Sequence, residues 1–251
     1  MSGHSKWSTI KRKKGKADAA RGRVFTKVGR EIITAARDGG GDPDTNPRLR
    51  TAIAAAKAVN MPADNIKRAI QRGTGEIPGA QYEEVMYEAY GPSGVAILIK
   101  ALTDNKNRTV AEIRHLLSKN NGNMGEAGSV AWMFTRAGLL EVDAAKITEE
   151  QLIEIALEAG ASDVVNDNGS FSVITEPEQF EDLRTALEAK GIEIANAELT
   201  MLPQNTIQLD EKSAEQMLKL MDALDEHDDV QKVWANFDID EAVMERLGAD
   251  G

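Results

Sequence analysis

Ten basic side chains lie within the first 30 residues, against a single acidic one, Asp18. Like charges at this density repel one another unless an anionic partner neutralises them, and nucleic acid is the commonest partner of this kind. Trp7 and Phe25 favour this interpretation, because an aromatic ring in a cationic arm is suited to stacking on a base. A solvated tail without a partner is the alternative. We predict nucleic-acid contacts from Trp7 and from the basic residues Lys6, Lys11, Arg12, Lys13, Lys14, Lys16, Arg21, Arg23, Lys27 and Arg30.

Two further arginines, Arg48 and Arg50, follow the glycine-rich segment that begins at Gly39. The glycines permit close approach of the backbone, and the arginines lie in the first turn of a predicted helix, where basic charge opposes the helix dipole. A bound phosphate would compensate this cost. We therefore add Arg48 and Arg50 to the predicted nucleic-acid contacts, although a plain interhelical linker explains the segment equally well.

Two polar loops are candidates for a secondary contact. Asp104, Asn105, Asn107 and Arg108 connect a predicted strand to a predicted helix, a position at which polar residues are expected in any case. The loop 120–128 is long and rich in glycine for a compact domain, which is typical of a contact surface but is not specific.

An acidic cluster at 222–229 falls at the end of a predicted helix, where negative charge is unfavourable. It indicates a solvated helix end or a contact with a basic surface, and a Mg²⁺ site is the alternative. The chain has no cysteine, its three histidines show no ligand spacing, and nothing resembles a nucleophile elbow, a Walker loop or a zinc helix. We therefore predict no enzyme, no catalytic residue, no cofactor, no metal and no small-molecule substrate.

The charge of the whole chain is segregated. The net charge is −11, yet residues 1–73 hold 17 basic and 6 acidic side chains, whereas the remainder holds 13 basic and 35 acidic. The sequence therefore predicts a basic head on an acidic body. No apolar run approaches the ~20 residues of a membrane span, and no signal peptide follows the basic start. We predict a cytoplasmic protein without a membrane partner; an organelle transit peptide is the alternative for the N-terminus.

Helical periodicity dominates the head. Apolar residues recur at helical spacing over 17–37, the pair Asn46-Pro47 is typical of a helix start, and a third helix begins after Met61-Pro62 and ends near Gly73. No clear helix-turn-helix motif is present, which argues against sequence-specific reading of DNA.

Strand patterns begin at Tyr82. Strands are predicted at 82–90, 95–102 and 129–135, with a helix opened by a capping box of Thr109 and Glu112. From Gly138 the order is strand, helix, strand, a tight turn at Asn168-Gly169, strand, helix and strand, which is the ferredoxin-like split motif. A last helix through 214–224 and a strand from Val230 would complete the earlier, unfinished sheet.

We predict an α+β fold: an N-terminal three-helix domain followed by two ferredoxin-like α/β domains, the third inserted into the second. A separate C-terminal αβ pair is the alternative, and it leaves two small half-sheets. The predicted domains are a basic helical head (1–78), a discontinuous middle domain (79–136 plus 206–240), an inserted domain (137–205) and a C-terminal tail (241–251).

Several of these segments together resemble the YebC/PmpR family over essentially the full chain. They are GHSKW (3–7), GGGDP (39–43), NPRLR (46–50), YEAYGPSG (87–94), DNKNRT (104–109) and GSV (128–130). Ala89 is a departure, since relatives often have glycine there. The resemblance implies a helical head with two α/β domains and a probable DNA-binding transcriptional regulator.

The same resemblance also implies a second role. Members, including mitochondrial translational activators, are similar to translation factors that act at the ribosome where consecutive prolines stall peptide-bond formation. A lysine-rich arm positions itself on phosphates without reading sequence, which favours ribosomal RNA on physical grounds, whereas transcription is the longer-standing label of the family. DNA and ribosomal RNA, the latter with the ribosome, both stay open as partners.

Overall fold

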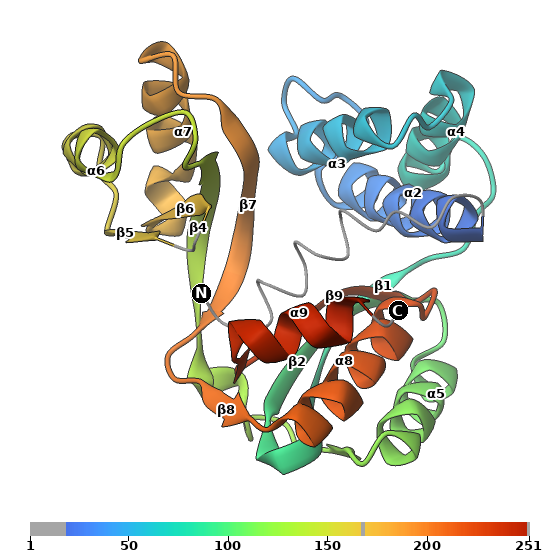
Figure 1. Cartoon of the computed structure of the whole chain (residues 1–251). Coiled ribbons are helices and arrows are strands. Elements are labelled where there is room, and N and C mark those ends of the chain that lie inside the picture. The colour runs from blue at the N-terminus through green and yellow to red at the C-terminus, as the bar shows by residue number, and fades with distance from the viewer. Residues whose placement is uncertain (1–18, 167–168, 250–251) are drawn as a thin grey trace.

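The computed structural model describes residues 19–166 and 169–249 (Figure 1). The predicted contacts Lys6, Trp7, Lys11, Arg12, Lys13, Lys14 and Lys16 lie outside the described residues. Figure 1 shows three parts: the head, the middle domain with its sheet and helices, and the inserted domain. This arrangement confirms the predicted α+β class with a helical head and two sheet-containing domains.

The described part of the head consists of α2 (Ala19–Gly39), α3 (Pro47–Ala58) and α4 (Ala63–Thr74). Asn46 caps α3 as predicted: its side chain accepts a hydrogen bond from the Leu49 backbone N–H at 3.1 Å. The same side chain donates to the carbonyl oxygens of Ala35 and Gly40, at 2.7 and 2.9 Å, and so ties the loop to α2. Phe25 packs against the head core, so its ring is not displayed for stacking as the sequence suggested.

The middle domain has a four-stranded sheet in the order β3-β1-β2-β9. Its strands are β1 (Glu83–Tyr90), β2 (Ala96–Thr103), β3 (Asn123–Met124) and β9 (Val230–Ala235). Strand β9 pairs antiparallel with β2, with Ile97 opposite Ala235. This pairing confirms that the third domain is inserted into the second, and the alternative of a separate C-terminal αβ pair is wrong.

Helices α5 (Lys106–Lys119) and α8 (Glu211–Asp225) cover one face of this sheet (Figure 1). Alternate residues of β2, Ile97 and Ile99, are fully buried against them because successive side chains of a strand point to opposite faces. Four antiparallel strands under two helices form the two-layer arrangement of a ferredoxin-like domain, although these strands connect in another order than in the split motif.

The C-terminal segment adds to the middle domain. A short parallel pair joins β8 (Ile207–Leu209) to β10 (Phe237–Ile239), and α9 (Glu241–Ala249) follows. Residues 241–251 were expected as a tail, but Met244 of α9 is buried in the core of the middle domain. We therefore propose domain boundaries where the sequence predicts them, except that α9 belongs to the middle domain.

The inserted domain has the sheet order β5-β6-β4-β7, which is that of the split βαββαβ motif. Its elements are β4 (Phe134–Asp143), α6 (Glu149–Glu158), β5 (Asp163–Asn166), β6 (Ser170–Thr175), the 3₁₀ turn η3 (Pro177–Gln179), α7 (Phe180–Ala189) and β7 (Ile194–Pro203). Leu140, Val173 and Leu183 are fully buried between the sheet and the two helices.

The inserted domain meets the uncovered face of the middle sheet. Phe134, at the start of β4, packs with Leu98 and Trp234 in a second buried cluster, and Trp234 Nε1 donates to the Thr200 hydroxyl at 3.0 Å. The predicted strand 129–135 is wrong over most of its length. Ala131–Met133 form the 3₁₀ turn η2, because the Glu88 carboxylate accepts the backbone N–H groups of Gly128, Val130 and Ala131 and draws this segment into a loop.

Candidate nucleic-acid interface

Three of the predicted contacts on α2, Arg23, Lys27 and Arg30, face the body of the protein. Arg23 pairs with Glu226 at 3.3 Å, and Lys27 lies 3.5 Å from a carboxylate oxygen of Asp225. Arg30 pairs with Asp229, donates to the Asp228 carbonyl oxygen at 2.7 Å, and lies 5.1 Å from the centre of the Tyr82 ring. The acidic cluster 222–229 therefore contacts a basic surface, which is one of its predicted roles, and that surface is the protein's own head. Arg21 lies on the same helix.

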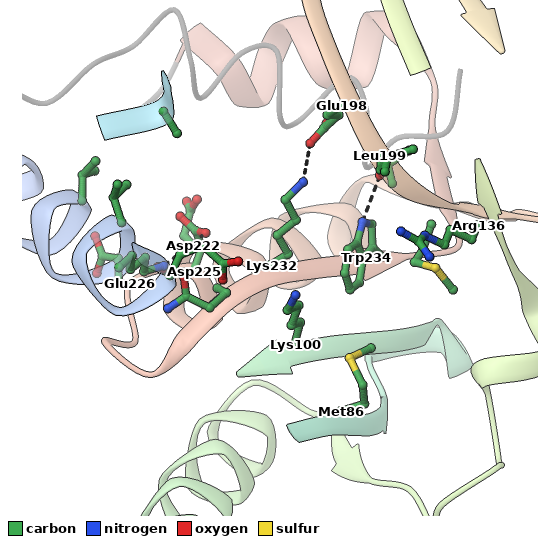
Figure 2. A pocket seen from close by; sticks show the side chains of 18 of the residues that line it. Met86, Lys100, Arg136, Glu198, Leu199, Asp222, Asp225, Glu226, Lys232 and Trp234 are labelled. Carbon is green, nitrogen blue, oxygen red and sulfur yellow. Dashed lines mark hydrogen bonds and ion pairs between the residues drawn. The ribbon is translucent and has the colours of Figure 1, made fainter. Parts of the chain in front are cut away.

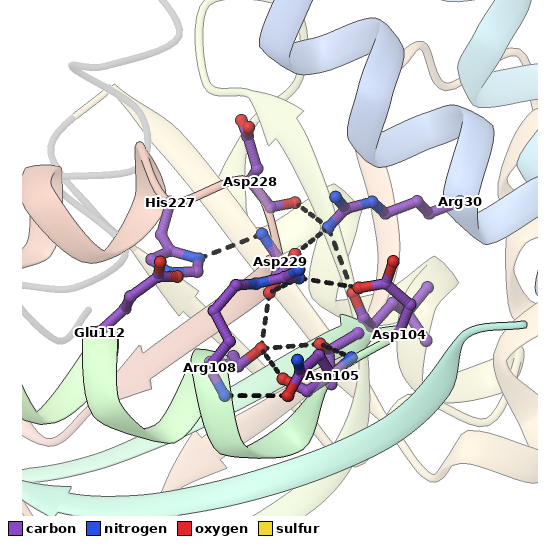
Figure 3. A network of polar contacts seen from close by, with 11 residues as sticks. Arg30, Asp104, Asn105, Arg108, Glu112, His227, Asp228 and Asp229 are labelled. Atoms are coloured by element: carbon purple, nitrogen blue, oxygen red, sulfur yellow. Dashed lines mark hydrogen bonds and ion pairs between the residues drawn. The ribbon is translucent and has the colours of Figure 1, made fainter. Parts of the chain in front are cut away.

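Asp229 is the centre of this contact (Figure 3). The side chain is only 3% exposed, and it accepts hydrogen bonds from Arg30, from Arg108 at 3.0 Å and from the Thr109 hydroxyl at 2.6 Å. Burial alone raises the pKa of this carboxyl, but the hydrogen bonds from Thr109, Arg108 and Arg30 outweigh burial and lower the pKa to about 2. The carboxylate is therefore ionised throughout the neutral range.

The predicted secondary contact loop is largely occupied by this network. Asn105 caps α5 by accepting from the Arg108 backbone N–H at 3.1 Å, and Asp104 pairs with Arg108 at 2.8 Å. The hydrogen bonds to Asp229 and Asp104 raise the pKa of Arg108. Asn107 is exposed on the first turn of α5. Asp104, Asn105 and Arg108 thus help to join α5 to the segment that follows α8, and all four residues of the loop stay exposed at the surface.

The capping box predicted from Thr109 and Glu112 is wrong, because the helix cap is Asn105, four residues before Thr109. Thr109 is fully buried, and its hydroxyl contacts Thr103 at 2.7 Å as well as Asp229. Thr109 thus forms part of the polar network around Asp229 and does not cap the helix. Sequence spacing alone does not distinguish the two roles.

Glu112, His227 and Asp229 come close enough to hold a metal ion, with ligand atoms within 4.8 Å of one another. Each is already engaged. His227 Nδ1 accepts the Asp229 backbone N–H at 3.1 Å, which leaves the ring proton on Nε2, 2.9 Å from Glu112. With both ring nitrogens and both Asp229 oxygens in hydrogen bonds, the group is a structural polar cluster and not an arrangement for Mg²⁺.

Arg48 and Arg50 have different surroundings. Arg48 pairs with Glu31 at 2.7 Å and with Glu84 of β1 at 2.8 Å, so it links the head to the middle sheet. Burial lowers the pKa of Arg48, but the bonds to Glu31 and Glu84 raise it more. Arg50 is exposed and donates to the carbonyl oxygen of Pro43 at 3.1 Å. Arg50 therefore stays available at the surface, whereas Arg48 has three carboxylate partners, the third being Asp38 at 3.3 Å.

Besides Arg37, which pairs with Asp38 at 2.8 Å, four cations of the head were not predicted as contacts. All four are exposed, lie on α3 and α4, and form no ion pair with any residue in 19–166 or 169–249; we call them the outer cations: Lys57, Lys67, Arg68 and Arg72. The signal was present in the sequence, because helical periodicity places Ile66 and Ala69 in the core and the charged residues between them on the opposite side.

A cleft of about 1980 Å³ lies between the head, the uncovered face of the middle sheet and β7 of the inserted domain (Figure 2). Its lining mixes both signs of charge and apolar side chains, and many of the charges are paired across it, such as Lys232 with Glu198. A nucleic-acid backbone binds where Lys and Arg neutralise its phosphates, so a cleft lined by both signs of charge is poorly suited to hold it. Residues shown in Figure 2 include Met86, Lys100, Arg136, Leu199, Asp222 and Trp234.

The fold and the charge distribution define a class of protein, a three-domain α+β chain whose helical head is basic and whose body is acidic. The family described as TACO1/YebC protein N-terminal domain matches residues 5–76, and TACO1/YebC second and third domain matches residues 82–237. The chain belongs to the TACO1/YebC family, which confirms the resemblance found in the sequence motifs.

Similar proteins span the whole chain. One from Desulfosudis oleivorans is 59% identical over 98% of this chain and 100% of its own length, and one from Desulfotalea psychrophila is 58% identical over 98% and 99%. Both are named probable transcriptional regulatory proteins. The crystal structure of a conserved hypothetical protein from Aquifex aeolicus is 49% identical and covers 89% of this chain and 93% of its own, with a TM-score of 0.79. Among the described helices, none has the length and apolar character needed to cross a membrane.

Proposed function

We propose that the protein is a non-enzymatic, nucleic-acid-binding regulator of gene expression that contacts its target through the head. The observation that carries this proposal is the exposure of Lys57, Lys67, Arg68 and Arg72 without carboxylate partners among the described residues. On a protein with a net charge of −11, exposed cations without a carboxylate partner in the described part of the chain are suited to an external anion. The names of the relatives support a regulatory role.

The sequence shows no clear helix-turn-helix motif, but the short connection between α3 and α4 in the structure favours DNA as the target. Helices α3 and α4 are joined by the four residues 59–62, a connection of the length that helix-turn-helix proteins use. In those proteins the second helix enters the major groove. Here α4 exposes Asn65, Lys67 and Arg68, side-chain types that hydrogen-bond to the edges of adenine and guanine. We therefore assign α4 as the element that meets the bases.

A ribosome-associated translation factor that binds ribosomal RNA and relieves stalling at proline runs is the second candidate. It is favoured by the segment from Lys6 to Lys16, whose lysines act as point charges and suit phosphates of irregular RNA better than the edges of base pairs. The acidic body behind the head would limit nonspecific adhesion in both cases.

The proposal is tested by measuring affinity for a DNA duplex of about 20 base pairs and a structured RNA of about the same mass. The triple variant Lys67→Ala/Arg68→Ala/Arg72→Ala and a chain without residues 1–18 should each bind at least about tenfold more weakly than wild type. The matched control removes three exposed cations from the body, Arg114→Ala/Lys119→Ala/Lys190→Ala, and should bind like wild type. Equal losses in the control and the head variants would contradict the proposal.

Crosslinking in cells then separates the two candidates. Reads concentrated on ribosomal RNA, together with cosedimentation with ribosomes and slower translation of proline runs in the absence of the protein, would support the translation factor. Reads confined to promoters, with no ribosome association, would support the DNA-binding regulator.

A further inference from the structure

Three cations of α2 form a single stripe against the acidic end of α8. Arg23, Lys27 and Arg30 are spaced by four and then three residues, which places them on one face of the helix. Their partners Glu226, Asp225 and Asp229 lie together where α8 ends and the chain turns into β9. Carboxylates of the body thus occupy a basic stripe that a row of phosphates would also fit.

We propose that this contact is an autoinhibitory latch, in which the acidic segment 225–229 competes with nucleic acid for the α2 stripe. The inference rests on the proposed function, since it concerns how the same head is regulated. In the latched state carboxylates occupy Arg23, Lys27 and Arg30, whereas the outer cations and Arg50 stay exposed to a nucleic acid. Release of the head adds the α2 stripe to the contact, and nucleic acid itself supplies the anion that replaces the carboxylates.

The burial of the three ion pairs increases along α2 from Arg23 to Arg30. This gradient determines which pairs break first. Side-chain exposure falls from 39% at Arg23 to 14% at Lys27 and 13% at Arg30, and on the acidic side from 60% at Glu226 to 3% at Asp229. Exposed ion pairs are weak and are screened by salt, whereas breaking a buried pair leaves an uncompensated charge. The pairs of Arg23 and Lys27 therefore exchange first.

Arg30 lies where a pivot is expected. It donates to the Asp229 carboxylate and to the carbonyl oxygens of Asp228 and Leu102, and its guanidinium lies over the ring of Tyr82, the last residue of the connection between α4 and β1. Arg48 holds the head to Glu84 close to the same connection. Arg23 is seven residues from Arg30, or about 10 Å along the helix, so a rotation of the head about Arg30 moves the Arg23–Glu226 pair farthest.

Competition of this kind lowers the apparent affinity by the fraction of molecules that is unlatched. It also improves selectivity, because a single stray anion replaces one carboxylate, whereas a row of phosphates replaces the carboxylates of Asp225 and Glu226 together. The latch therefore predicts that neutralising Asp225 and Glu226 tightens binding of nucleic acid, although a general loss of negative charge elsewhere does not.

The test uses the full chain and the double variant Asp225→Asn/Glu226→Gln, with Glu154→Gln/Glu158→Gln as the control. Both control residues are exposed on α6 of the inserted domain, and both variants remove two negative charges. With an RNA of about 30 nucleotides and a DNA duplex of about 20 base pairs as probes, we expect the latch variant to bind about three to ten times more tightly than the control.

A distance measurement reports the latch directly. The chain contains no cysteine, so Ala58→Cys on α3 and Ser118→Cys on α5 accept a pair of fluorophores, one on the head and one on the body. Energy transfer should fall when salt rises from about 50 to about 500 mM and when either probe is added. In the latch variant it should be low from the start, and in the α6 control it should match wild type.

The outcomes separate the latch from the proposed function. Equal affinities and equal energy transfer in the latch variant and the control, with binding intact, would overturn the latch alone. Failure of every variant to bind either probe would overturn the latch and the proposed function together.

Discussion

Arg30 of α2 and Asp229, 199 residues apart in the sequence, form a buried ion pair that joins the head to the body (Figure 3). The same carboxylate accepts hydrogen bonds from Arg108 and Thr109 of α5. One side chain therefore ties together α2, α5 and the segment between α8 and β9. Removing the Asp229 carboxylate should therefore lower the stability of the body and change the position of the head.

Asp229→Asn should lower the free energy of unfolding by about 3 to 5 kcal/mol, because it leaves Arg30 without its buried counter-charge. Urea denaturation followed by circular dichroism measures the change. Asp228→Asn is the matched control: its side chain is exposed, and it should change the free energy by less than about 0.5 kcal/mol. Equal effects of the two substitutions would show that the buried network is not a stabilising element.

Stability should also depend on pH through Asp229. Its pKa is lowered from 3.8 to about 2 in the folded protein, so the ionised carboxylate contributes stability that is complete above pH 4 to 5 and is lost as the pH falls toward 2. The contribution amounts to about 2 kcal/mol. The free energy of unfolding of wild type should therefore fall more steeply between about pH 5 and pH 2 than that of Asp229→Asn. Parallel curves for the two proteins would contradict the assignment.

Glu88→Gln should loosen the loop that leads into β4. The Glu88 carboxylate accepts the N–H groups of Gly128, Val130 and Ala131 at 2.6, 2.6 and 2.8 Å. Burial raises the pKa of the Glu88 carboxyl, but these backbone hydrogen bonds lower the pKa by more than burial raises it, as expected for a charged acceptor. We expect a loss of about 1.5 to 3 kcal/mol and faster hydrogen exchange at the three amides.

Glu126→Gln is the control for the Glu88 substitution. Glu126 is exposed in the same loop, and the Ser129 N–H bonds to its backbone carbonyl oxygen, which the substitution leaves in place. The control should alter neither the stability nor the exchange rates. Unchanged exchange in Glu88→Gln would mean that the loop is held by its other contacts.

Gly73→Ala should destabilise the head, because α4 crosses α2 closely at this residue. An added Cβ would lie 2.4 Å from the Ile33 carbonyl oxygen and 2.7 Å from the Ala36 Cβ. The helices would have to separate, at a cost of about 1 to 3 kcal/mol. Gly29→Ala on α2 meets open space and should instead stabilise the protein by about 0.5 to 1 kcal/mol. Thermal denaturation of the two variants should give shifts of opposite sign.

Substitution of the outer cations should change the salt dependence of binding. Each phosphate contact contributes a slope of about −0.9 for duplex DNA and about −0.7 for a single strand in log affinity against log salt. Lys67→Ala/Arg68→Ala/Arg72→Ala should therefore reduce the magnitude of the slope by about 2 to 3 where all three meet phosphates, and by about 1 where Lys67 and Arg68 meet base edges. An unchanged slope, measured by fluorescence anisotropy over a salt series, would exclude these residues from the phosphate contact.

Much of the fold follows from local patterns in the sequence. The start of α3 at Pro47 follows from the Asn46 cap, and the continuous apolar run of β2 predicts an interior strand. The unfinished sheet of the middle domain predicts that its last strand comes from the far end of the chain, and β9 supplies it. Capping, periodicity and the need to complete a sheet act over a few residues or a single sheet, so they can be read before the tertiary structure is known.

Local patterns fail where a more distant group competes for the same atoms. Thr109 and Glu112 have the spacing of a capping box, but Asn105 caps the helix and Asp229 takes the Thr109 hydroxyl. The segment before β4 has the composition of a strand, but Glu88 binds its N–H groups and removes them from a ladder. Asp229 and Glu88 come within hydrogen-bonding distance of these atoms only when the chain has folded.

The sequence by itself determined that this protein has a basic head and an acidic body, because charge segregation is a property of composition. The tertiary structure decided which cations remain for a partner. Arg23, Lys27 and Arg30 look as available as any others in the sequence, yet they pair with carboxylates 198 to 203 residues away, whereas Lys67, Arg68 and Arg72 stay exposed. Coulomb attraction has no sequence periodicity, so the pairing depends on how the domains pack, and packing is set by the buried apolar faces.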